Sequence, residues 1–132
     1  MMHFIGKFGS KDANRVSFSD FEVRAFAANN AEILFESDAI YIDGHGLIEA
    51  PTECRVAGRV TLREYDHERS RWTGLDINSP YHLKDICEWV VEGDTLFIRG
   101  FQIESGRWNE YRICDFELWV QRANQGVDAE QT

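Results

Sequence analysis

Two acidic residues are the nearest approach to a catalytic pair in this chain. Glu64 and Asp66 stand two positions apart, and on a β-strand this spacing puts both side chains on one face, about 6–7 Å from each other. Carboxylates at that separation approach the geometry of inverting glycoside hydrolysis. Both residues also neighbour Arg63, Arg69 and Arg71. The pattern therefore favours a solvated hairpin tip whose charges neutralise one another.

The cysteines and histidines suggest packing instead of catalysis or metal binding. Cys54 and Cys114 alternate with apolar residues, so we expect both to be buried as small hydrophobic side chains. A catalytic thiol needs a nearby histidine, and only His82 and Cys87 stand within five positions of each other. The sequence has neither His-x-x-x-His nor Cys-x-x-Cys spacing. No metal site and no cofactor is predicted.

Other catalytic motifs are missing from the chain. It contains no Gly-x-Ser-x-Gly nucleophile elbow and no phosphate-binding loop with the Gly-x-x-x-x-Gly-Lys-Ser/Thr spacing. Whether the protein is an enzyme stays open, with the sequence leaning against it, because active sites are often assembled from scattered residues. The residues that would serve such a site are Glu64, Asp66, His67 and His82.

An arginine stripe follows one side of the segment 53–65. Arg55, Arg59 and Arg63 repeat every four residues, so they share a face if this segment is a strand. Three guanidinium groups in a row could bind a phosphate or carboxylate ligand. The alternative is cross-strand pairing with acids such as Asp76 or Glu117, each pair contributing less than ~1 kcal/mol. We favour the pairing.

The last strongly patterned segment, 108–122, suits a partner-binding surface. Acids and large aromatic residues share one of its faces, and aromatic anchors beside charges are typical of protein interfaces. If a second layer covers this face, its apolar members belong to the core instead. The predicted partner-binding residues are Trp108, Tyr111, Asp115, Glu117 and Trp119.

The charge balance narrows the class of partner. The formal net charge is −9, which disfavours nucleic acid and anionic membranes and favours a protein with a basic surface. No segment approaches the ~20 apolar residues of a membrane span, and the N-terminus does not resemble a signal peptide. Three widely spaced cysteines make no disulfide framework. We therefore expect a cytoplasmic protein.

The elements that must position these residues are β-strands. Between Glu53 and Tyr65 the residues alternate, with Cys54, Val56 and Leu62 on the apolar side, a period typical of a half-buried strand. Turn signals recur every eight to twelve residues and predict about eight to ten antiparallel strands, in a sandwich or a small barrel. At most one short helix is expected, within 81–87.

The expected turns are Asn29-Asn30, a two-residue hairpin at Ser37-Asp38, Asp43 to Gly46, Asp66 to Ser70, Gly93-Asp94 and Ser105-Gly106, with a break near Ser19 and Asp20. We predict one antiparallel β domain over residues 1–122 and a disordered polar tail over 123–132. Unpaired sheet edges could permit a homodimer.

Two functions from different classes follow. The first is a non-enzymatic, acidic protein-binding module that covers a basic partner surface, as an immunity-type or accessory protein would. The alternative is a small-ligand-binding barrel, in which the arginine stripe receives an acidic headgroup and aromatic side chains line a cavity. Those side chains are Phe18, Phe21, Phe35, Trp72, Trp89, Phe97 and Phe101.

Overall fold

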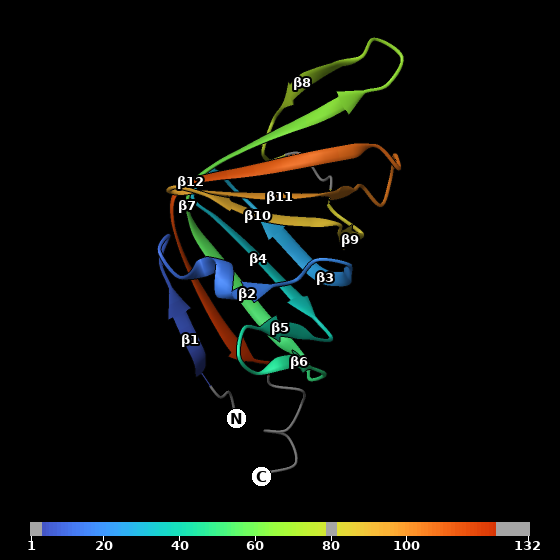
Figure 1. Cartoon of the computed structure of the whole chain (residues 1–132). Coiled ribbons are helices and arrows are strands. Elements are labelled where there is room, and N and C mark those ends of the chain that lie inside the picture. The colour runs from blue at the N-terminus through green and yellow to red at the C-terminus, as the bar shows by residue number, and fades with distance from the viewer. Residues whose placement is uncertain (1–3, 79–81, 124–132) are drawn as a thin grey trace.

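The computed structural model describes residues 4–78 and 82–123, and this part of the chain is almost entirely antiparallel β structure (Figure 1). The one helical turn found in it is the 3₁₀ turn η1 (Ala13–Arg15). The strands are β1 (Phe4–Phe8), β2 (Val16–Ser17), β3 (Phe21–Ala28), β4 (Glu32–Ser37), β5 (Ile40–Ile42), β6 (Gly46–Ile48), β7 (Thr52–Asp66), β8 (Arg71–Leu75), β9 (Asp85–Ile86), β10 (Glu88–Glu92), β11 (Thr95–Phe101) and β12 (Trp108–Arg122). The all-β prediction is confirmed.

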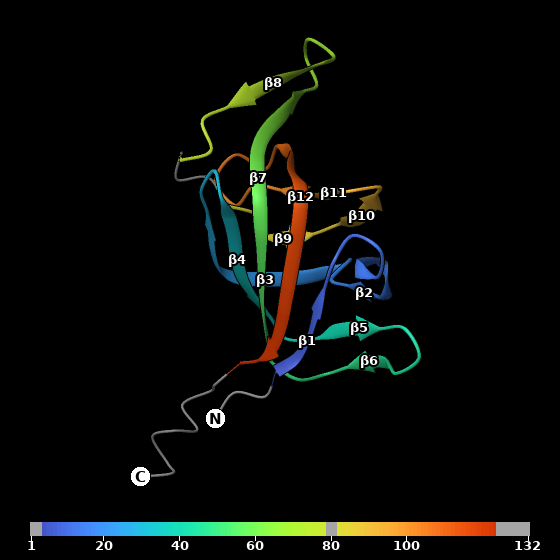
Figure 2. The same cartoon turned by 90° about the vertical axis from the view of Figure 1, so that its left-hand side faces the viewer.

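Most strands belong to one large, bent sheet. Its order is β10-β11-β12-β7-β4-β3-β9, with β1 added to β12 and β8 added to β7. A smaller sheet, β2-β5-β6, packs beside it. The sheets are sandwich-like and are not closed into a barrel. The hairpin of β7 and β8 projects away from the rest of the molecule (Figures 1 and 2).

The two central strands, β7 and β12, are each 15 residues long and lie side by side (Figure 2). Both strands bend partway along their length (Figure 1). β12 bulges between Cys114 and Glu117, with Asp115 at a φ of 53°. Gly58 of β7 lies opposite this bulge, and a Cβ atom there would come within 2.7 Å of the Cys114 carbonyl oxygen. The glycine thus permits the close approach. The bend divides each strand into two halves that have different neighbours.

The interior follows the alternation that the sequence predicts for β7. Cys54, Val56 and Leu62 are buried, whereas Arg55 is exposed. Aromatic rings fill the space between the layers. Phe18 lies 5.0 Å from Phe35 and 5.1 Å from Trp89, measured between ring centroids, which is ordinary packing distance. Buried apolar side chains from both sheets make up this core. We call the side of the large sheet that points away from it the outer face.

The alternation predicted for β12 is wrong in its first half. Tyr111 and Ile113 are buried, and so are Phe116 and Leu118, while Cys114 is only partly buried. A bulge adds one residue to a strand and therefore exchanges the two faces beyond it. Tyr111 consequently belongs to the core, on the opposite face from the acids and the tryptophan with which the sequence pattern grouped it.

Two expected elements also differ. Ser37 and Asp38 do not close a hairpin, because β4 pairs in the large sheet and β5 pairs in the small one. No helix occurs within 82–87. There the Lys84 N–H donates to the Phe101 carbonyl at 2.9 Å. The segment crosses β11 at Gly100, where a side chain would collide with the backbone of Asp85.

The remaining turns agree with the sequence. At the β3–β4 turn, for example, Asn29 Oδ1 accepts hydrogen bonds from the Ala31 and Glu32 N–H groups. Ala123, the first residue of the predicted tail, is buried, and its N–H donates to the Pro51 carbonyl at 2.9 Å. Residues 124–132 lie outside the described part of the chain.

Candidate functional site

A groove of about 400 Å³ crosses the outer face. It lies over β4, the first half of β7 and the second half of β12. We call it the Trp119 groove, and its lining residues are Ala25, Leu34, Phe35, Glu36, Glu53, Cys54, Arg55, Trp119 and Gln121. A hollow of this size falls within the range of pockets that hold a small ligand or an anchoring side chain.

The floor of the groove is a row of directly opposed residues. Leu34 stands opposite Arg55, Arg55 opposite Trp119, and Trp119 opposite Lys7. The Arg55 guanidinium carbon lies 4.8 Å from the Trp119 ring centroid and Lys7 Nζ lies 5.5 Å from it, both within cation–π range. Leu34 is 39% exposed. The half-buried Trp119 therefore lies between two cations, and Leu34 presents apolar surface to solvent at the end of the row.

Carboxylates border this row. Glu36 and Glu53 are direct cross-strand partners, an unfavourable pairing of like charges. Arg24 Nε lies 3.4 Å from Glu36 Oε1, and Gln121 Nε2 donates to Glu53 Oε1 at 3.0 Å. In the described part of the chain, Glu53 has no cationic partner. Acids exceed cations by two around the groove, with Glu32, Glu36, Asp38, Glu53 and Glu117 set against Lys7, Arg24 and Arg55.

The five predicted partner-binding residues do not form one surface. Trp119 lines the groove. Glu117 stands two positions before it on β12, and its Oε2 lies 3.3 Å from Lys7 Nζ. Asp115 is exposed at the bulge and accepts a hydrogen bond from Arg59 at 2.8 Å. Trp108 is opposite Phe101 on the other half of β12, with ring centroids 5.0 Å apart. Tyr111 is only 1% exposed, so its side chain belongs to the core and does not contribute to a binding surface.

The sequence did not predict that residues of β4 contribute one side of the groove. Leu34, Glu36 and Glu53 come from β4 and the start of β7. The alternation in 32–36 could have placed Leu34 and Glu36 on one face, but nothing local indicates that this face adjoins Trp119.

The arginine stripe is paired, as favoured, although with other acids than those named. Arg55 binds Glu32 at 2.9 Å and Arg59 binds Asp115 at 2.8 Å. Arg63 Nε donates to Glu110 Oε1 at 2.6 Å. These partners come from β4 and β12, which flank β7 in the sheet. The order of the strands, which the sequence does not reveal, decides which acids are available.

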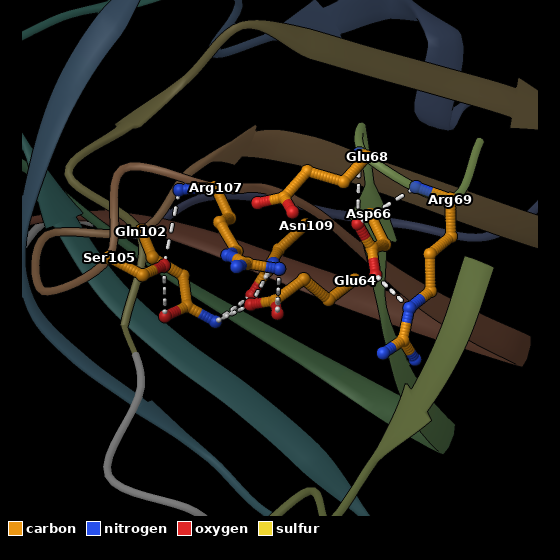
Figure 3. Close-up of polar contacts among 8 residues, drawn as sticks. All are labelled: Glu64, Asp66, Glu68, Arg69, Gln102, Ser105, Arg107 and Asn109. Carbon is orange, nitrogen blue, oxygen red and sulfur yellow. Dashed lines mark hydrogen bonds and ion pairs between the residues drawn. The ribbon is translucent and has the colours of Figure 1, made fainter. Parts of the chain in front are cut away.

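Glu64 is the centre of a polar network at one end of the core (Figure 3). Gln102 Nε2 and Asn109 Nδ2 each donate to Glu64 Oε2 at 3.2 Å, and Arg107 Nη1 lies 3.8 Å from Oε1. Gln102 Nε2 also donates to Asn109 Oδ1, and its Oε1 accepts from Ser105 Oγ at 3.1 Å. Both amides are buried. The network fastens the turn after β11 onto β7.

Asp66 has a structural role at the neighbouring tip. Its Oδ1 accepts the N–H groups of Glu68 and Arg69 at 3.0 and 3.2 Å (Figure 3). Desolvation alone would raise the pKa of Asp66, but these N–H groups, together with Arg107 and Arg69, outweigh it and hold the pKa below its ordinary value. Glu64 and Asp66 therefore each bind their own structural donors. This arrangement supports the interpretation of a stabilised hairpin tip over that of a hydrolytic pair.

Two histidines named as catalytic candidates, His67 and His82, pack against aromatic rings. The His67 ring contacts Tyr65 edge-on, and the His82 ring lies beside Phe26. Burial raises the pKa of the Cys54 thiol, and burial together with Asp85 raises that of Cys87. Both thiols are therefore kept protonated, which disfavours nucleophilic chemistry. No group of residues suited to holding a metal ion is found over 4–78 and 82–123.

The described strands do not form the closed barrel that the ligand-binding alternative requires. The sheet is not closed, and Phe18, Phe35 and Trp89 contact one another in the core. Other aromatic residues assigned to the cavity lie elsewhere: Phe101 is 43% exposed, and Phe97 lies on the outer face beneath two arginines. Phe97 and Phe101 therefore lie apart from the core that Phe18, Phe35 and Trp89 fill.

Comparison with known proteins identifies no relative. No protein family, curated protein or solved structure was found to match this chain. Among the described residues, no helix has the length and apolar character to cross a membrane.

Proposed function

We propose that the protein is a non-enzymatic binding module whose Trp119 groove receives a basic side chain and an adjoining apolar side chain of a partner protein. The observation that carries the proposal is the unfavourable pairing of Glu36 with Glu53 beside the half-buried Trp119 and the exposed Leu34. A lysine or arginine placed between the two carboxylates would relieve their repulsion. The adjoining apolar group would cover Leu34 and the Trp119 ring.

The charge of the whole chain supports a basic partner. At a net charge of −9, the protein attracts cationic surfaces over several ångströms and speeds their encounter. Tryptophan and arginine are the residues most often responsible for binding energy in interfaces, and here Arg55 is stacked on Trp119 before any partner arrives. An immunity-type or accessory role, in which the module covers a basic functional surface, is one form of this function. We place it in the cytoplasm, where thiols remain reduced.

Selection from a displayed library of random peptides on the immobilised full chain tests the proposal. We expect the enriched peptides to carry arginine or lysine next to a large apolar residue. Glu53→Lys should weaken the binding of a selected peptide at least about tenfold, because it replaces a charge-assisted hydrogen bond with a repulsion. Trp119→Ala should weaken it similarly by removing the apolar floor.

The matched control is Glu92→Lys, which makes the same change of charge at the exposed end of β10, opposite Thr95. It should leave peptide binding within about twofold of the original. If the two charge variants weaken binding equally, or if the enriched peptides are not basic, the groove is not the binding site. Circular dichroism spectra of all variants would separate a loss of binding from a loss of fold.

A further inference from the structure

A second feature of the outer face lies beyond the bend, far along β7 and β12 from the Trp119 groove. A row of alternating charges crosses four adjacent strands there. Arg63, Glu110, Arg99 and Glu88 are successive cross-strand partners on β7, β12, β11 and β10. Glu110 accepts hydrogen bonds from Arg63 Nε at 2.6 Å and from Arg99 Nε at 2.8 Å. Since Glu110 is only 1% exposed, it fixes the orientation of both guanidinium groups from beneath.

Arg112 adds a third guanidinium beside this row. Its Nη2 lies 3.8 Å from Glu110 Oε1, which is longer than a hydrogen bond, and its guanidinium carbon lies 5.4 Å from the Phe97 ring centroid. Arg63, Arg99 and Arg112 thus face the carboxylates of Glu88 and Glu110. This part of the surface carries an excess positive charge within a chain of net charge −9.

A hollow of about 350 Å³ opens directly above these groups, lined by Thr61, Leu62, Arg63, Trp72, Gly74, Glu110 and Arg112. Gly74 stands opposite Arg63 on β8, and a Cβ added there would meet nothing within 4 Å. A glycine inside a strand often marks a place where a ligand approaches. Trp72 forms a wall, and the Arg63 guanidinium carbon lies 4.0 Å from its ring centroid.

We propose that this hollow binds a small organic anion, with its carboxylate or phosphate held by Arg63 and Arg112 and its apolar part against Trp72. Guanidinium groups pair with both kinds of oxyanion through two parallel hydrogen bonds. Glu110 already holds Arg63 in place, so less side-chain freedom is lost on binding. This site is independent of the Trp119 groove, and either can fail without the other.

The test is a titration of the full chain, followed by the NMR signals of the arginine Nε–H groups and the tryptophan indole N–H groups. The probes are benzoate and phenyl phosphate, with benzamide as the neutral control of similar shape. We expect saturable shifts at Arg63, Arg112 and Trp72 with at least one anion, and the anion that binds more tightly identifies the headgroup. Equal binding of benzamide, or no saturation at millimolar concentrations of either anion, would overturn the proposal.

Variants distinguish specific binding in the hollow from a general electrostatic attraction of anions to the surface. Arg112→Gln should weaken binding about tenfold or more, and Gly74→Leu should abolish it by filling the hollow. Arg71→Gln is the control, because it removes the same charge from an exposed position on β8 outside the hollow. We expect it to change affinity less than twofold. Equal losses in the two arginine variants would contradict the site, and this comparison stands even if Gly74→Leu fails to fold.

Discussion

Glu36 and Glu53 are direct partners across β4 and β7, although elsewhere on this face the sheet pairs acids with arginines. Arg55, two positions beyond Glu53 on the same strand, has Glu32 within 2.9 Å. A sheet that pairs opposite charges elsewhere has retained two like charges here, beside the half-buried Trp119 and the exposed Leu34. Such local conflicts with folding preference are expected where a protein binds something.

The first prediction follows from this repulsion. Glu53→Gln should raise the free energy of unfolding by about 0.5 kcal/mol, since it removes a like-charge pair, while it weakens the binding of a basic peptide to the groove. Urea denaturation at neutral pH measures the first effect. Glu92→Gln, which removes a charge opposite Thr95, should change neither quantity appreciably. A loss of stability in Glu53→Gln would show that the carboxylate serves the fold instead.

The second prediction concerns the bend in the two long strands. Gly58→Ala should destabilise the protein by about 1–3 kcal/mol, because the new methyl group would lie 2.7 Å from both the Cys114 carbonyl oxygen and Ile113 Cγ2. Gly74→Ala is the matched control, as its methyl group meets nothing within 4 Å. Thermal unfolding of the pair should show a lowered midpoint for Gly58→Ala alone. Equal midpoints would mean that β7 and β12 do not approach each other so closely.

The third prediction is a pH dependence that originates at Glu110. Burial would raise the pKa of this carboxyl group, but hydrogen bonds from Arg63 and Arg99 outweigh burial and hold the pKa below its ordinary value of 4.5. Its ionised form therefore stabilises the folded state above about pH 4.5, and that contribution is lost as the pH falls through the lower, folded-state pKa.

Glu110→Gln should accordingly lower the free energy of unfolding by about 1–2 kcal/mol at neutral pH. The gap between variant and wild type should narrow as the pH is lowered below 4.5. Urea denaturation at a series of pH values checks this. A gap that stayed constant down to strongly acidic pH would contradict the assignment of the charge to Glu110.

The fourth prediction tests the structural role of the Glu64 network. Asn109→Ala removes a donor from a glutamate that two amides and an arginine hold. We expect a loss of about 1–3 kcal/mol in the free energy of unfolding. In a double-mutant cycle with Glu64→Gln, the two changes should couple by at least about 0.5 kcal/mol. Strict additivity would indicate that Glu64 does not fasten the turn.

The sequence predicts well whatever depends on the local period of the backbone. The alternation of Cys54, Val56 and Leu62 with Arg55 follows from the geometry of any extended chain, and the folded strand buries the expected side. The turn at Asn29 likewise depends on hydrogen bonds to N–H groups two and three residues away. The sequence also predicted that the arginines form cross-strand ion pairs, although not with which acids, because such a pair needs only an acid on a neighbouring strand.

What the sequence could not determine depends on contacts between distant segments. Tyr111 faces the core because β12 bulges at Asp115 where it crosses Gly58 of β7. The residues before and after the bulge look equally regular in the sequence. The separation of β4 from β5 was hidden in the same way, because a two-residue connection does not specify which sheet the next strand joins.

The candidate sites also depend on contacts between distant segments of the chain. The Trp119 groove combines Leu34 and Glu36 of β4 with Glu53 of β7 and Trp119 of β12, segments that only the strand order makes adjacent. Composition and alternation are properties of neighbours in the chain, so the sequence alone determined an acidic, antiparallel β protein. Register, bulges and strand order are decided by the packing of the whole chain, because each strand's pairing must also bury its apolar face. Tertiary structure therefore decided which charges meet and where the outer face is hollow.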